Sequence, residues 1–119
     1  MIIEAWHADS LAGPMGEMKK AFEAKNTGLT VNLTSGRSKE LAERILKGDA
    51  CDVFAPSDPA VVKDMFGKQV GGKAAASWYV VFSANEMVVV TGKGNPLGIK
   101  QMSDLAKSGV RLARVTGEK

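Results

Sequence analysis

The first half of the chain repeats one pattern three times: a short apolar stretch, a polar turn, and a longer segment with apolar residues every three or four positions. The short stretches predict strands at residues 2–6, 29–33 and 52–55, and the longer segments predict a helix after each strand. The third of these helices is predicted to begin with Asp58 as its cap and Pro59 at its first position. The apolar positions of these helices are Leu11, Met15, Met18 and Phe22; Leu41, Ala42, Ile45 and Leu46; and Val61, Val62, Met65 and Phe66. This alternation predicts an α/β fold, with a mostly parallel sheet and helices on both of its faces.

The second half of the chain has a less regular pattern. We predict a loop at 67–73, strands at 78–82, 86–91 and 110–115, and a short helix that begins at Ser103 and ends at Gly109. Each of the first three strands leads into a helix, whereas the last predicted strand is followed only by a turn. The pattern therefore predicts that the chain stops within a strand–turn–helix unit.

Length and charge narrow the classes of function. A chain of 119 residues corresponds to one domain or to part of a larger one. Its net charge is +3 without a run of basic residues, which argues against nucleic-acid binding. No apolar stretch reaches the roughly 20 residues of a membrane helix, and residues 1–4 do not resemble a signal peptide. A cytosolic protein and a mature secreted protein with an added Met are both compatible with this start.

Two serines are the main candidates for a binding site. Ser10 and Ser38 are the expected N-cap residues of two helices, each in the turn that follows a predicted parallel strand. Ligands of open α/β sheets bind at the carboxyl ends of the strands, and the N–H groups at a helix start attract anions. The alternative is that both serines only cap their helices, a role that stabilises a protein by about 1 kcal/mol.

Charged and titratable neighbours leave further alternatives open. Arg37 adds positive charge beside Ser38, or it is simply solvated. Asp9 would repel a fully ionised anion and would suit a ligand that carries a proton, unless it points away and caps the helix itself. His7 either packs beneath the turn or reaches the ligand.

Signatures of enzymes are absent from the sequence. It contains no phosphate-binding loop, no nucleophile elbow and no Cys/His metal spacing. Cys51 stands at the start of a strand, where an unreactive buried thiol is common, and a nucleophilic role would need His7 or another base beside it. We therefore predict a protein that is not an enzyme and that needs no metal or cofactor.

The segment His7-Ala8-Asp9-Ser10-Leu11 resembles the H-A-G-S-L opening of molybdate/tungstate-binding proteins of ABC importers, in the type 2 periplasmic binding protein superfamily. Asp9 replaces the glycine of that motif. The resemblance continues through the turn at Ser38, and then through residues 50–58, 85–90, 104–106 and 110–113, so that it covers nearly the whole chain.

The resemblance implies a two-lobed periplasmic or other extracytoplasmic receptor that closes on a tetrahedral oxyanion and delivers it to the membrane subunits of an ABC importer. Ser10 and Ser38 match the family's ligand-binding serines of the first lobe, and the metal atom of the oxyanion is held only through its oxygens. Residues 1–84 correspond to most of lobe one. Residues 85–119 correspond to the crossover strand and the beginning of lobe two, truncated before that lobe is complete.

Other functions within the same superfamily remain open at this point. Asp9 leaves the choice among molybdate, tungstate, sulfate and phosphate undecided. An oxyanion-sensing domain of a transcriptional regulator is the alternative to an import receptor. For the 119-residue chain by itself, we predict a dimer or larger assembly, because an open sheet edge and apolar helix faces favour exchange of the segment from residue 87 onward.

Overall fold

The structure is a computed structural model that describes residues 1–84, 86 and 88–113. Its internal contacts divide the chain into two compact units, Met1–Val81 and a second unit that begins at Phe82. The first unit contains a three-stranded sheet and its helices, and the second is built around one short helix. The predicted division between residues 84 and 85 into two lobes stays a prediction.

The first unit is a parallel α/β layer, as the sequence predicts. Its strands are β1 (Ile2–Ala8), β2 (Thr30–Gly36) and β3 (Val53–Ala55), in the order β2-β1-β3, and both pairings are parallel. The connecting elements are a 3-10 turn η1 (Asp9–Leu11) with helix α1 (Ala12–Lys25), then α2 (Ser38–Leu46), and finally α3 (Pro59–Lys63) after β3. The chain thus starts with the central strand and adds one neighbour on each side.

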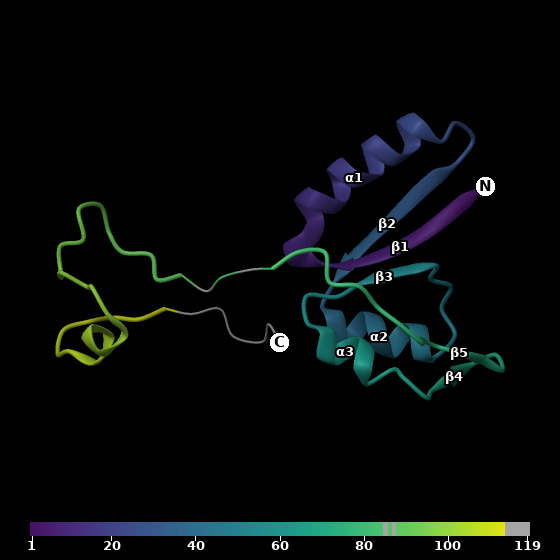
Figure 1. The fold of residues 1–119 in the computed structure, drawn as a ribbon. Helices are drawn as coiled ribbons and strands as arrows, with labels where there is room; N and C mark the ends of the chain where they lie inside the picture. Colours follow the sequence, from purple (N-terminus) through teal and green to yellow (C-terminus); the bar gives the residue numbers. More distant parts are fainter. Residues whose placement is uncertain (85, 87, 114–119) are drawn as a thin grey trace. The chain divides into compact units, whose positions relative to one another are not determined.

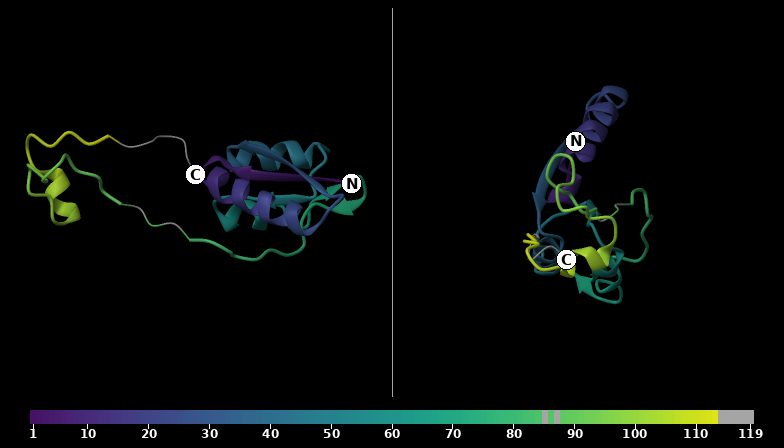
Figure 2. Two further views of the ribbon diagram at one scale, coloured as in Figure 1. Left: turned by 90° about the horizontal axis from the view of Figure 1, so that it is seen from above. Right: turned by 90° about the vertical axis from the view of Figure 1, so that its left-hand side faces the viewer.

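Helices cover both faces of this sheet. In Figure 1, α1 lies on one side of β1 and β2, while α2 and α3 lie together on the other side, and the right-hand view of Figure 2 agrees. Two buried clusters correspond to these two faces. The α1 side buries Ala5, Ala8, Leu11, Met15, Val31 and Ala55, and the α2–α3 side buries Trp6, Leu41, Ala42, Ile45, Val61 and Met65.

The predicted apolar face of α1 is buried only over its first half. Met15 is buried, whereas Met18 and Phe22 are exposed. Polar contacts hold the second half of the helix to β2: the Glu23 carboxylate accepts the N–H of Val31 at 2.7 Å, and the Lys19 ammonium donates to the carbonyl of the same residue. Charge-assisted hydrogen bonds therefore take the place of the expected apolar packing.

The third strand–turn–helix segment confirms the predicted start of its helix. Asp58 is the N-cap of α3 and its carboxylate accepts the N–H of Ala60 at 2.8 Å, while Pro59 occupies the first turn. The segment 67–73, predicted as a loop, instead contains a small hairpin of β4 (Gln69–Val70) and β5 (Lys73–Ala74). Gly71 and Gly72, both with positive φ, form its turn.

Three predicted strands of the second half are wrong over the residues that the structure describes. Residues 78–82, the described part of 86–91, and 110–113 are all irregular. Trp78 and Val90 are 74% and 87% exposed. A strand exists only when a neighbour pairs with it, and in the described part of the chain no strand pairs with these segments. Residues 114 and 115 of the last predicted strand lie outside the described residues.

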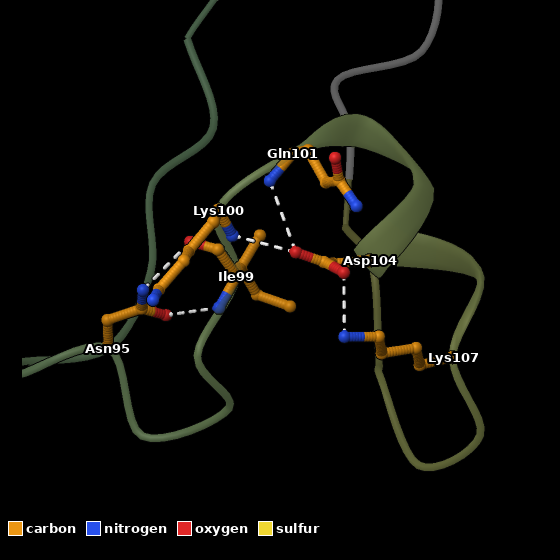
Figure 3. A network of polar contacts seen from close by, with 6 residues as sticks. All are labelled: Asn95, Ile99, Lys100, Gln101, Asp104 and Lys107. Carbon is orange, nitrogen blue, oxygen red and sulfur yellow. Dashed lines mark hydrogen bonds and ion pairs between the residues drawn. The ribbon is translucent and has the colours of Figure 1, made fainter.

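The second unit contains the predicted short helix as a 3-10 helix, η2 (Met102–Ala106). Figure 3 shows the network around it, in which the buried carboxylate of Asp104 accepts the N–H groups of Lys100 and Gln101 at 2.9 and 3.2 Å. The Lys107 ammonium lies 2.6 Å from the other carboxylate oxygen. The contact with Lys107 and the two N–H groups lower the pKa of Asp104 to about 2.

Candidate functional site

The three parallel strands of the first unit end at nearly the same level. The last residues of β1 and β2, Ala8 and Gly36, are paired with each other, and Ala55 at the end of β3 is paired with His7. A helical segment follows each strand within a few residues. The carboxyl edge of this sheet therefore carries three strand-to-helix turns, in the position where open α/β sheets bind ligands.

A serine occurs at the same point of each turn. Ser10, Ser38 and Ser57 each stand two residues after the final residue of their strand. The sequence pattern indicated the first two serines but not Ser57. The Asp58 cap and the prolines on either side of it were enough to account for the turn in which Ser57 lies. The regular spacing exists only with the observed strand ends: from the predicted ends at 6, 33 and 55, the three serines stand four, five and two residues further on, so the sequence pattern could not have identified Ser57.

Ser10 is not a helix cap, which corrects the prediction. It lies inside η1, Ala8 precedes that turn without a side-chain cap, and Leu11 is the N-cap of α1. The cause is that β1 continues to Ala8, two residues further than predicted, because it pairs with β2 along its whole length. The side chain of Ser10 is consequently exposed at the carboxyl edge of the sheet.

Ser38 is also displaced from the predicted cap position, by one residue. Arg37 is the N-cap of α2, and its carbonyl accepts the N–H of Leu41 at 3.0 Å. Ser38 is the first helical residue and is only 4% exposed. Its hydroxyl oxygen accepts the backbone N–H of Ser57 at 3.1 Å and lies 3.3 Å from the hydroxyl oxygen of Ser57. The Ser38 hydroxyl therefore links the turn before α2 to the turn before α3.

The two charged candidates are both exposed. The guanidinium of Arg37 lies 3.4 Å from the carboxylate of Glu40, one helical turn away, in a contact that solvent screens. Asp9 begins η1 and is exposed beside Ser10. Ala8 and Leu11 occupy the N-cap positions of η1 and α1, so Asp9 is not the helix cap that the sequence leaves open as its structural role.

His7 is buried beneath the turn, with 2% of its surface exposed. Its Nδ1 lies 2.8 Å from the carbonyl oxygen of Ala8. A carbonyl only accepts, so Nδ1 carries the hydrogen in this contact. This position agrees with the interpretation of His7 as a strand-end residue packed under the loop.

Cys51 lacks the properties of a nucleophile. Burial raises the pKa of its thiol to about 11, and the thiol donates to the carbonyl of Val53 at 3.2 Å. A thiol with this pKa is protonated at neutral pH, whereas the thiolate is the reactive form. The arrangement favours a packing role against the α2–α3 side of the sheet.

Metal binding and membrane insertion also lack support in the described part of the chain. Across residues 1–84, 86 and 88–113, no three acidic, histidine or cysteine side chains gather as a metal would require. None of the helices found there has the length and apolar character needed to cross a membrane.

Comparison with known proteins identifies the family that the chain resembles. Residues 3–119 match the family model described as bacterial extracellular solute-binding protein. Proteins called molybdate-binding protein ModA, from Mycobacterium bovis and Mycobacterium tuberculosis, are 32% identical to the chain over 112 residues. That alignment covers 92% of the chain and 41% of each mycobacterial protein.

A relative from Methanoculleus marisnigri, described only as an uncharacterized solute-binding protein, is 33% identical over 88 residues. The alignment covers 73% of the chain and 23% of that protein. The chain thus spans less than half the length of these curated relatives.

Proposed function

Because the chain belongs to the family of bacterial extracellular solute-binding proteins, we propose that the protein containing it captures a tetrahedral oxyanion, with molybdate or tungstate as its preferred ligand. We further propose that it works outside the cytoplasm and passes the anion to the membrane subunits of an ABC importer, without carrying out a chemical reaction. The 32% identity to molybdate-binding proteins supports this choice of solute.

One structural observation carries the proposal. The paired strand ends at Ala8 and Gly36 both lead directly into helical segments, each with a serine two residues further on. The first N–H groups of α2 have no acceptor within the helix and lie at its positive end. Neutral donors of this kind suit a small dianion, and Ser10 and Ser38 are the hydroxyl groups that we assign to it.

Selectivity among oxyanions follows from the same donors. Molybdate and tungstate are fully deprotonated at neutral pH, whereas phosphate retains a proton that needs an acceptor. Hydroxyl and N–H donors satisfy the first kind of ligand better than the second. Arg37 would add positive charge at the edge, and the carboxylate of Asp9 would accept the hydrogen that phosphate carries.

Isothermal titration calorimetry of the full-length protein with molybdate, tungstate, sulfate and phosphate at neutral pH tests the proposal. We expect molybdate or tungstate to bind most tightly. Tighter binding of phosphate would overturn the choice of anion and point to Asp9 as a proton acceptor, and heat from none of the four would overturn the oxyanion assignment.

The alternative within the superfamily, an oxyanion sensor of a transcriptional regulator, is distinguished by the genomic sequence upstream of the chain. A signal peptide there supports the import receptor. A helix-turn-helix segment supports the regulator.

A further inference from the structure

Ser57 is the residue of the carboxyl edge that neither the sequence analysis nor the proposed function uses. It belongs to the turn between β3 and α3, yet both its backbone N–H and its hydroxyl lie against the hydroxyl of Ser38, at 3.1 and 3.3 Å. Its own side chain is exposed, whereas Ser38 is buried. Two different strand-to-helix turns therefore meet at one hydroxyl group.

The hydrogen-bonding capacity of a serine hydroxyl determines what this contact does. The group has one hydrogen to donate and two lone pairs that accept. The Ser57 N–H can only donate, so it occupies one lone pair of Ser38 in every state. The second contact, between the two hydroxyl oxygens, is reversible, because either oxygen can be the donor.

We propose that Ser57 is a positioning residue that makes the Ser38 hydroxyl a donor toward the bound anion. When the Ser57 hydroxyl also donates to Ser38, both lone pairs of Ser38 are occupied, and its hydrogen is left for the ligand. A hydroxyl that accepts two hydrogen bonds is also a stronger donor, since hydrogen bonds in a chain polarise one another. This inference rests on the proposed function and adds to it a determinant of selectivity.

The consequence for selectivity concerns protonated anions. With its lone pairs occupied, Ser38 cannot accept the proton of phosphate, so the pair of serines favours fully deprotonated oxyanions. Removal of the Ser57 hydroxyl frees one lone pair of Ser38. We therefore expect Ser57→Ala to weaken molybdate binding by about three- to tenfold, the range of one ordinary hydrogen bond, and to change phosphate binding less.

The test uses the full-length protein, with molybdate and inorganic phosphate as the probes in calorimetry. Ser57→Ala keeps the backbone N–H and loses only the hydroxyl, and Ser57→Thr restores a hydroxyl at the same position. Asp58→Ala is the matched control, because it removes the α3 cap next to Ser57 without touching Ser38. The supporting result is a lower molybdate-to-phosphate affinity ratio in Ser57→Ala, recovery in Ser57→Thr, and an unchanged ratio in Asp58→Ala.

A double variant separates positioning from direct contact. If Ser57 acts through Ser38, Ser57→Ala has no further effect on molybdate affinity in a Ser38→Ala background. An additional loss in that background, an unchanged ratio in Ser57→Ala alone, or an equal shift in Asp58→Ala would each overturn the inference. Wild-type protein that binds no oxyanion would overturn the proposed function instead.

Discussion

Ser10→Ala and Ser38→Ala distinguish a binding role from a structural role, because the structure gives the two serines different surroundings. Ser10 is exposed, and no side-chain cap bond forms at its turn. Ser38 is buried and accepts the N–H of Ser57. If both donate to an oxyanion, both variants lose affinity, but only one of them loses an internal hydrogen bond.

The expected magnitudes follow from these contacts. Loss of a hydrogen bond to a charged group costs about 1.5–3 kcal/mol, so each variant should bind molybdate about tenfold to a hundredfold more weakly. In the free protein, Ser38→Ala leaves the Ser57 N–H without its acceptor, which costs about 1 kcal/mol of unfolding free energy. Ser10→Ala should stay within about 0.5 kcal/mol of the wild type, as exposed substitutions do.

The assay combines calorimetry with urea unfolding of the ligand-free, full-length protein. The expected pattern is a loss of affinity in both variants and a loss of stability in Ser38→Ala alone. The reasoning is refuted if affinity is unchanged while Ser38→Ala is destabilised, because both serines would then be structural. Equal destabilisation by Ser10→Ala would refute the placement of that side chain at the exposed edge.

Four further outcomes are expected. The Cys51 thiol should react with a maleimide or disulfide reagent far more slowly in native than in unfolded protein at pH 8, because its raised pKa leaves almost no thiolate; equal rates would contradict this. Above pH 9 the free energy of unfolding should fall, because the Cys51 thiol ionises in the unfolded protein before it ionises in the native protein. Cys51→Ala should remove this loss of stability. Asp104→Asn should increase hydrogen exchange in residues 95–107. In the wild type, exchange of the same residues should increase as the pH falls from about 4 toward 2, because the lowered pKa of Asp104 stabilises the folded form only while its carboxylate is ionised. The isolated 119-residue polypeptide should be a dimer or larger by light scattering, since apolar side chains such as Trp78 and Val90 are exposed; a monomer at micromolar concentration would contradict it.

The first unit could be predicted from the sequence because its signals are local. Apolar spacing at three and four residues identified the helices, and the Asp58-Pro59 pair located the start of α3 correctly. Strand ends depend on neighbouring strands, which a local pattern does not contain. β1 and β2 therefore extend further than predicted, to Ala8 and Gly36, and this extension displaced both serines from the expected cap positions.

The strands predicted in the second half failed for a related reason. Val88, Val89 and Val90 have the composition of a strand, but β-propensity describes how a side chain fits between neighbours and does not supply the neighbour. The link between Ser38 and Ser57 was equally beyond the sequence, because it joins residues 19 positions apart through one hydroxyl group. Only the three-dimensional arrangement of the turns reveals it.

The strand order β2-β1-β3 has a consequence for how the protein is made on the ribosome. The central strand is synthesised first, but Glu4 meets Asn32 only 28 residues later and Asp52 only 48 residues later. Until β2 has emerged from the exit tunnel, β1 has no partner strand, and until β3 has emerged one edge of β1 stays unpaired and available to chaperones or to other nascent chains. The contacts that complete the sheet are distant in sequence, so the closing of long loops should limit the folding rate of this unit. A nascent chain released before β3 would lack one side of the sheet and the third turn of its carboxyl edge.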